Sequence, residues 1–225
     1  MSIRVLLADD HELIREGLKS RLNLEPDINV VAEATQGEEA LRLLKSATVD
    51  VALLDVNMPK LNGLEVLSRL RAEQARKDQV RVIFLSVHDE REYIERAVKL
   101  GAAGYILKDT RMQDLVDGVR RCHAGENYFS TRAALQLVDW AQNQQERLSR
   151  RQENAKAFGL SARELEILEL VSAGRTNKEV ANALGLSVRT AETHRQNIRE
   201  KLGAKNSAEL IRIAIEQELV PFQSS

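Results

Sequence analysis

Residues 51–63, VALLDVNMPKLNG, contain the pattern that decides the fold of the first half of this 225-residue chain. A continuous apolar run at 51–54 ends at the carboxylate of Asp55. Short continuous runs of this kind are typical of strands that are covered on both faces. Similar runs occupy four further stretches, at 3–8, 30–34, 82–85 and 104–107. Helical patterns alternate with them, near 12–23, 37–46, 63–76, 90–100 and 112–124. Five βα units in a row predict an α/β fold with a doubly wound, five-stranded parallel sheet.

The second half of the chain has no strand signals. Residues 131–156 have the pattern of a helix that continues into a polar stretch, and the absence of Gly and Pro favours a helical linker over a partly disordered one. Residues 160–218 are divided into four short helices by capping-box patterns at Ser161 and Thr176, and by glycines at positions 174, 185 and 203. We therefore predict an N-terminal domain at 1–129, a linker at 130–157 and an all-α four-helix domain at 158–225.

The composition indicates a globular protein, with 43% hydrophobic and 30% charged residues and a net charge of −1. Residues 158–225 carry nine Lys and Arg against nine Asp and Glu, so nucleic-acid binding must depend on local placement of charge. The single cysteine, Cys122, excludes an internal disulfide, and we expect it half-buried on a helix. No apolar run reaches about 18 residues, and the N-terminus lacks the pattern of a signal peptide. We expect a cytoplasmic protein with no membrane partner.

Charged side chains gather at the predicted ends of several strands. Asp9 and Asp10 end the first strand and Asp55 ends the third. Because the carboxyl ends of parallel strands meet at one edge, we expect these three carboxylates to converge. Their oxygens favour Mg²⁺, which would relieve the mutual repulsion. Lys108 and Ser86 follow the fifth and fourth strands, and a metal with a lysine can neutralise charge during phosphoryl transfer to a carboxylate. Taken singly, each of these residues is also consistent with a solvated charge at a strand end.

Residues 3–124 resemble the receiver domain of two-component response regulators. The resemblance is carried by LLADDH at 6–11, LLDVNMPKLNG at 53–63, FLSVH at 84–88 and GYILKD at 104–109. It implies a flavodoxin-like fold in which Asp55 is the phosphoacceptor. It also implies that Mg²⁺ is bound by Asp9, Asp10, Asp55 and the backbone carbonyl of Asn57, and that the phosphoryl group and the switch involve Ser86, Tyr105 and Lys108.

Four residues at or beside the predicted pocket are Tyr105, Asp109, His11 and His88. Tyr105 matches the aromatic residue that changes rotamer on activation, and the alternative is a half-buried tyrosine with its hydroxyl in water. Asp109 stands where many receivers have a proline. The resemblance therefore does not predict the detailed geometry of the loop near Lys108. His11 and His88 flank the pocket, and we expect loop histidines rather than metal ligands because they lack helical ligand spacing.

Residues 187–202 form the second helix of a predicted helix-turn-helix, with Ser187 as N-cap. An apolar stripe of Val188, Ala191, Ile198 and Leu202 should pack on the preceding helix. The opposite face should contact base edges, through Arg189, Glu192, Thr193 and Gln196. Five further residues are placed for DNA phosphates: Lys178, Thr190, His194, Arg195 and Lys201. The alternative is a helical bundle with a solvated charged face.

Residues 158–218 resemble the LuxR-type DNA-binding domain of the NarL/FixJ family, most clearly in NKEVA at 177–181 and TAETHRQNIREKLG at 190–203. Glu192 departs from the pattern, since many relatives have a cation there. The resemblance implies binding to double-stranded DNA as a dimer, with a contact through the helix near 206–218. We expect Trp140, which precedes this domain, to pack in the core or between domains rather than on a base.

The sequence thus predicts a transcription regulator in which phosphorylation of Asp55 controls dimerisation and sequence-specific DNA binding. The implied partners are a sensor histidine kinase, DNA and a second copy of the chain when phosphorylated, with RNA polymerase as a further candidate. The chain would be no enzyme beyond its own phosphorylation and dephosphorylation. One alternative is an aspartate-based phosphatase, although Asn57 stands where such enzymes need a second carboxylate. The other is a regulator independent of phosphorylation, which the complete acidic pocket disfavours.

Overall fold

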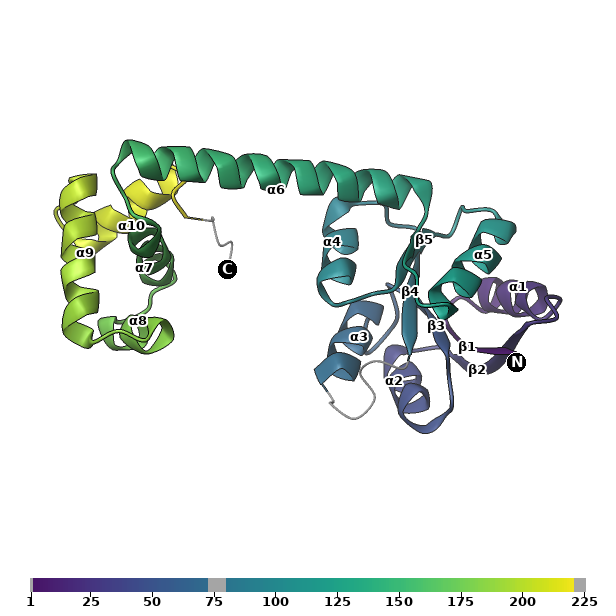
Figure 1. Ribbon diagram of the computed structural model, residues 1–225. Helices are drawn as coiled ribbons and strands as arrows, with labels where there is room; N and C mark the ends of the chain where they lie inside the picture. Colours follow the sequence, from purple (N-terminus) through teal and green to yellow (C-terminus); the bar gives the residue numbers. More distant parts are fainter. Residues whose placement is uncertain (1, 73–79, 221–225) are drawn as a thin grey trace. The chain divides into compact units, whose positions relative to one another are not determined.

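The computed structural model describes residues 2–72 and 80–220. The chain divides into two compact units, residues 1–141 and 142–225. In Figure 1 the first unit runs from purple to teal-green and the second from green to yellow. Helix α6, Thr131–Ala157, passes through the boundary between them, and the helical interpretation of the linker is therefore confirmed.

The first unit is a parallel sheet with the strand order β2-β1-β3-β4-β5-β6. The five predicted strands are confirmed, with bounds β1 Ile3–Ala8, β2 Ile28–Ala34, β3 Val51–Asp55, β4 Arg81–Ser86 and β5 Gly104–Leu107. The short β6, Tyr128–Phe129, extends the sheet beyond β5 and was not predicted. Asp55 and Ser86 are the last residues of β3 and β4, so the strands themselves place both side chains at one edge.

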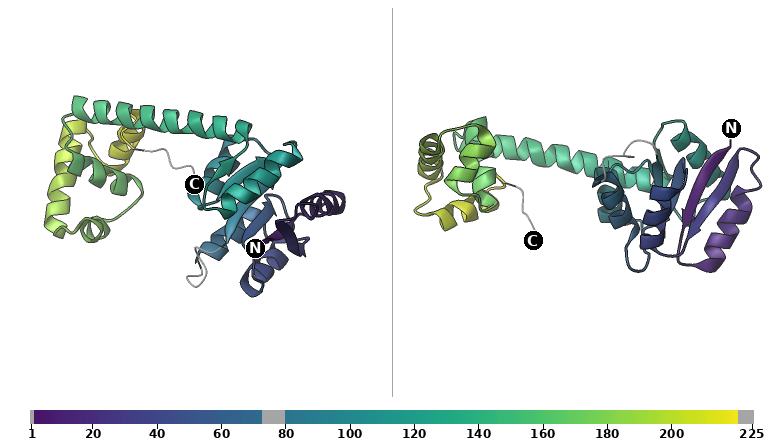
Figure 2. Two further views of the ribbon diagram at one scale, coloured as in Figure 1. Left: turned by 45° about the vertical axis from the view of Figure 1, so that its right-hand side comes forward. Right: turned by 90° about the horizontal axis from the view of Figure 1, so that it is seen from below.

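Helices cover both faces of this sheet (Figures 1 and 2). Their bounds are α1 Glu12–Leu22, α2 Gly37–Ser46, α3 Gly63–Ala72, α4 Arg91–Lys99 and α5 Met112–His123. The predicted helix at 63–76 matches α3 up to residue 72, and its last part lies outside the described residues.

Strand residues alternate between two hydrophobic clusters, one on each side of the sheet. Ala52 and Leu54 point toward the cluster with α2, α3 and α4, while Val51 and Leu53 belong to the cluster with α1 and α5. This double burial explains why the strands are continuous apolar runs rather than alternating ones. Cys122 lies in the second cluster and is fully buried, deeper than predicted, with its Sγ 3.4 Å from the carbonyl oxygen of Ala103.

The second unit contains, within residues 142–220, the end of α6 and the four predicted helices. These are α7 Ala162–Ser172, α8 Asn177–Leu184, α9 Val188–Leu202 and α10 Ser207–Glu216. Both predicted capping boxes are present, at Ser161 and Thr176. Gly185 ends α8 in the left-handed conformation with φ 65°, which a residue with a side chain would adopt only with strain. The turn from α8 to α9 is therefore the tight turn of a helix-turn-helix.

Across residues 2–72 and 80–220, none of the helices combines the length and the apolar character needed to cross a membrane.

Candidate functional site

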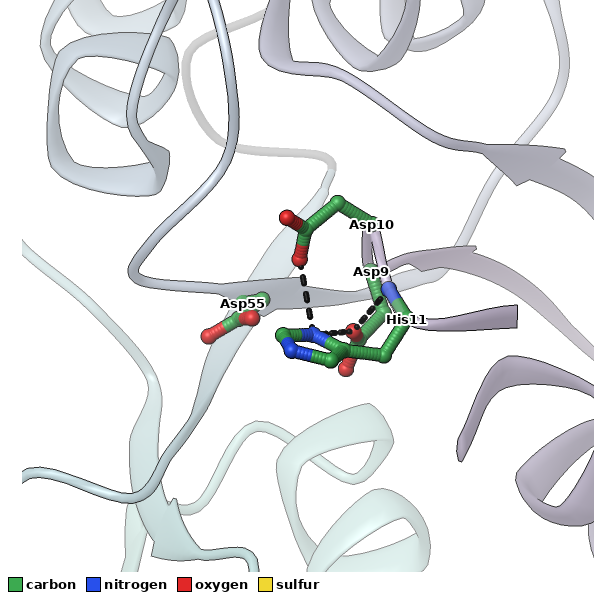
Figure 3. A group of neighbouring side chains, drawn as sticks. All are labelled: Asp9, Asp10, His11 and Asp55. Atoms are coloured by element: carbon green, nitrogen blue, oxygen red, sulfur yellow. Dashed lines mark hydrogen bonds and ion pairs between the residues drawn. The ribbon is translucent and has the colours of Figure 1, made fainter. Parts of the chain in front are cut away.

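The carboxyl edge of the sheet brings together the acidic side chains predicted from the sequence. Asp9 and Asp10 directly follow β1, and Asp55 ends β3. One ligand atom from each of these three residues and from His11 lies within 4.8 Å of the others (Figure 3). Asp9 and Asp55 are buried, whereas Asp10 and His11 face solvent. The acidic cluster, defined as Asp9, Asp10, His11 and Asp55, is thus half-buried and open on one side.

Lys108 supplies the positive charge of this edge. Its Nζ lies 2.7 Å from Asp55 Oδ2 and 2.7 Å from Asp9 Oδ2. Burial raises the pKa of the Asp55 carboxyl above its ordinary value, and the nearby charge of Asp9 adds to this, while Lys108 opposes both. Burial lowers the pKa of Lys108, but its contacts with the two carboxylates outweigh this and the net shift is upward. One ammonium is therefore paired with two buried carboxylates, so the positive charge of Lys108 does not neutralise the negative charge of the site.

The donor set of the acidic cluster fits a hard divalent cation. The carboxylates of Asp9, Asp10 and Asp55 provide oxygen ligands, which Mg²⁺ prefers. The buried Asp9 Oδ2 lies 2.7 Å from the Lys108 ammonium, and no second donor among the described residues reaches it. A cation beside this oxygen would give it a further partner and reduce the repulsion among the acids.

The loop after β3 is held close to Asp55. The backbone N–H of Asn57 donates to Asp55 Oδ1 at 3.3 Å, and the N–H of Gly63 donates to the carbonyl oxygen of Val56 at 2.9 Å. A Cβ at Gly63 would lie 2.3 Å from the carbonyl oxygen of Asp55, which leaves no room for a side chain. Close packing of α3 against the end of β3 thus requires this glycine.

Ser86 and Tyr105 are connected through the backbone of His88. Ser86 Oγ accepts a hydrogen bond from the His88 N–H at 3.0 Å, and the Tyr105 hydroxyl donates to the His88 carbonyl oxygen at 2.9 Å. Tyr105 is 0% exposed, and its burial raises the pKa of the hydroxyl to about 12. The alternative of a half-buried tyrosine with its hydroxyl in water is therefore wrong. The rotamer switch remains a prediction.

The two histidines occupy loops, as expected, but they differ in their contacts. His11 Nδ1 lies 2.8 Å from Asp10 Oδ1 and 3.2 Å from Asp9 Oδ1, so this residue joins the acidic cluster. Sequence spacing could not show this, because the contact depends on the conformation of the loop before α1. His88 instead lies with its Nε2 2.7 Å from the amide nitrogen of Asn57.

Helix α9 presents the predicted base-reading face to solvent. All four side chains of that face are exposed: Arg189, Glu192, Thr193 and Gln196. Ala191, Ile198 and Leu202 are buried against the unit, as predicted. The placement of Val188 in the buried stripe is wrong, because this residue is 44% exposed. It is the first residue of α9, and the members of the buried cluster on this helix are Ala191, Ile198 and Leu202.

The residues predicted for DNA phosphates divide into two groups. Lys178 and Thr190 are exposed, and His194 is half-buried. Arg195 and Lys201 hold the helices of the unit together. Arg195 donates to Asn177 Oδ1 at 3.0 Å and to Ser207 Oγ at 3.1 Å, and so connects α9 with α8 and α10.

Lys201 forms an ion pair that sequence reasoning missed. Its Nζ donates to Glu164 Oε2 at 2.7 Å and to the carbonyl oxygen of Gly159 at 2.8 Å. Glu164 is the acidic residue of the capping box predicted at Ser161. Although burial raises the pKa of Glu164, the hydrogen bonds from Lys201 and Ser161 outweigh it and the net shift is downward. Buried charges are usually paired, but the sequence shows neither that Glu164 is buried nor which cation reaches it, so no local signal identifies Lys201 as its partner.

Both units match known families. The family model described as "Response regulator receiver domain" matches residues 5–120, and the model described as "Bacterial regulatory proteins, luxR family" matches residues 159–214. The transcriptional regulatory protein MctR of Rhizobium johnstonii is 40% identical over 97% of this chain and 95% of its own length. The oxygen regulatory protein NreC of Staphylococcus epidermidis is 35% identical over 98% of this chain and 100% of its own. The receiver-domain structure of the response regulator NarL from Mycobacterium tuberculosis is 40% identical, with a TM-score of 0.53 over 56% of this chain and 98% of that one.

A receiver-type sheet with an acidic edge, followed by a helix-turn-helix unit, defines a DNA-binding response regulator. This class consists of transcriptional regulators of two-component systems. The full-length similarity is specific enough for a narrower assignment: the chain belongs to the NarL/FixJ family of response regulators.

Proposed function

We propose that Asp55 accepts a phosphoryl group from a phosphohistidine of a sensor kinase and that this event controls dimerisation and DNA binding. The observation that carries the proposal is the position of Lys108 Nζ, 2.7 Å from two buried carboxylates at the solvent-open edge of the sheet. In the transfer, a carboxylate oxygen of Asp55 forms a bond to phosphorus while the bond between phosphorus and the histidine nitrogen breaks. The site residues carry the roles that the family resemblance implies.

Each residue of the site has a chemical task in this transfer. A magnesium ion held by Asp9, Asp10, Asp55 and the carbonyl of Asn57 would neutralise charge on the phosphoryl oxygens. Lys108 exchanges its contact with the Asp55 carboxylate for one with the phosphoryl group, and Ser86 donates its hydroxyl to a phosphoryl oxygen. Asn57 offers no carboxylate to activate water, which disfavours the phosphatase alternative.

The remaining assignments complete this proposal. The functional domains are residues 1–129 and 158–225, with 130–157 as the helical linker. The phosphorylated chain acts in the cytoplasm as a homodimer on double-stranded DNA, with RNA polymerase as a further candidate partner. In this scheme Arg189, Glu192, Thr193 and Gln196 contact base edges, and exposed residues such as Lys178 contact phosphates.

A phosphoryl mimic at Asp55 is expected to increase DNA affinity about 5- to 150-fold, because coupling between two sites in one protein typically falls in this range. The measurement compares binding to duplexes selected from a random pool, with and without beryllofluoride and Mg²⁺, alongside the oligomeric state. The Asp55→Asn variant is the control, and its affinity should not respond. Unchanged affinity and unchanged oligomeric state in the wild type would contradict the proposal.

Alanine at exposed positions of the DNA-binding unit should separate base contacts from phosphate contacts. Arg189→Ala and Gln196→Ala should each relax preference at particular base pairs by about 1–3 kcal/mol. Lys178→Ala should weaken binding to all sequences equally and flatten the slope of log K against log salt by about one unit. Competition assays over a set of single-base variants of the selected duplex measure both effects. The orientation of α9 is wrong if neither Arg189→Ala nor Gln196→Ala changes the order of preference.

A further inference from the structure

The first turn of α6 carries an arginine that contacts two loops of the phosphorylation site. Arg132 Nη1 donates to Asp109 Oδ2 at 2.9 Å, and Arg132 Nη2 donates to Asp89 Oδ2. Asp109 follows β5, and Asp89 follows β4. The three residues, Arg132, Asp89 and Asp109, are called the loop clamp below. A guanidinium can hold two carboxylates at once because its donors point in fixed, separate directions.

Both acids of the loop clamp are direct neighbours of the site. Asp109 follows Lys108, whose ammonium contacts Asp55 and Asp9. Asp89 follows His88, whose backbone bonds to Ser86 and Tyr105. A backbone shift that accompanies movement of Lys108 or Ser86 toward a phosphoryl group on Asp55 would therefore act on a loop that contains a partner of Arg132.

The start of α6 is also attached to the strand that carries Tyr105. The N–H of Ser130 donates to the carbonyl oxygen of Tyr105 at 3.0 Å, and Ala133 is fully buried in the cluster that contains Tyr105. Residues 130–133 thus have a backbone bond to β5, a buried side chain in the core and two ion pairs to loops of the site. These contacts connect both loops to the start of the linker helix.

The ion pairs of the loop clamp are solvent-exposed and contribute little to the stability of the fold. The side chains of Arg132, Asp89 and Asp109 are 57%, 41% and 67% exposed. Exposed ion pairs contribute little to stability, so the contacts can be exchanged at little energetic cost. Asp109 also has no counterpart in the many receivers that place proline there, and the clamp gives this departure a physical role.

We propose that Arg132 is a positioning residue that holds the two loops to α6 in the unphosphorylated protein and releases at least one of them when Asp55 is phosphorylated. This inference rests on the proposed function, since it needs phosphorylation of Asp55. The clamp favours the unphosphorylated state. Its loss lowers the free-energy difference that phosphorylation has to overcome.

The test measures DNA affinity of full-length Arg132→Gln with and without beryllofluoride, on the same selected duplex as the wild type. The unphosphorylated variant should bind more tightly, and the gain from beryllofluoride should fall about 3- to 10-fold. Arg132→Lys, which keeps the charge but has a single donor group, should show an intermediate gain. Phosphoryl incorporation from a small donor should be unchanged, because Arg132 does not contact Asp55.

Arg121→Gln is the matched control. Arg121 lies on α5, is similarly exposed and pairs with Glu126, just after that helix, rather than with either loop of the clamp. Its removal should therefore leave the gain from beryllofluoride unchanged. If the wild type responds to beryllofluoride and Arg132→Gln responds equally, the clamp inference is overturned while the proposed function stands. If the wild type does not respond, the proposed function itself fails. Asp109→Asn should reproduce part of the effect, and an unchanged gain there would also contradict the inference.

Discussion

Replacement of Asp55 by Asn is expected to abolish phosphoryl incorporation completely. The amide is neutral and a poor nucleophile, so it cannot form the acyl phosphate. Its one oxygen can accept from Lys108 or from the Asn57 N–H, but its nitrogen would then face the other donor. The measurement is the intact mass of each protein after incubation with a small phosphodonor and Mg²⁺. Wild type should gain one phosphoryl group, and chelation of divalent cations should prevent this gain.

The control for this variant is Asp117→Asn. Asp117 is an exposed carboxylate on α5 that contacts Arg120 and Gln113 and is not part of the acidic cluster, so its loss should not affect incorporation. Equal incorporation by wild type and Asp55→Asn would mean that another residue is the acceptor. The arrangement of Lys108 beside Asp9, Asp10 and Asp55 would then need a function other than phosphorylation of Asp55.

Lys201→Met is expected to destabilise the second unit by about 3 kcal/mol. Removing one partner of a buried ion pair leaves the other charge uncompensated, and typical costs are about 3–5 kcal/mol. The lower end applies because Lys201 is 37% exposed, although Glu164 is only 5% exposed. Hydrogen exchange of peptides from α7 and α9 in the full-length protein, measured in increasing urea, reports the change. Lys205→Met, at an exposed lysine just after α9, should have little effect.

The same pair predicts a pH dependence of stability. Because the pKa of Glu164 is lower in the folded unit than its ordinary value of 4.5, the pair stabilises the fold above pH 4.5. This contribution is lost as the pH falls through the folded value. The difference in stability between wild type and Lys201→Met should therefore be largest near neutral pH and shrink in acid. If Lys201→Met instead leaves stability unchanged and flattens the salt dependence of DNA binding, Lys201 is the phosphate contact that the sequence predicts.

The sequence predicted those features that depend on pattern along the chain. Continuous apolar runs identified five strands, and carboxylates at their ends identified the cluster of Asp9, Asp10 and Asp55. Strand β6 was missed because two residues are too short to form a pattern. Capping boxes and glycines gave the helices of the second unit for the same reason, since these signals are local.

The missed features depend on the conformation of a loop or on contacts between distant segments. His11 joins the acidic cluster through a loop conformation, and Lys201 reaches Glu164 across 37 residues of sequence. Asp109 could be identified only as a departure from the family pattern, because its partner Arg132 lies on another element. Val188 follows the helical period of the buried stripe, but periodicity does not show where the neighbouring helices end.

The depth of Cys122 determines how this protein can be labelled. It is the only thiol in the chain, it lies fully buried on the side of α5 that packs on the sheet, and burial raises the pKa of the Cys122 thiol to about 11. Only the thiolate reacts with maleimides and related reagents, so at neutral pH the native residue is both shielded and unreactive. A cysteine introduced on an exposed turn of each unit would therefore take up a spin label or fluorophore selectively in the otherwise unmodified protein. Pairs of such labels would measure the distance between the receiver and the DNA-binding unit before and after phosphorylation.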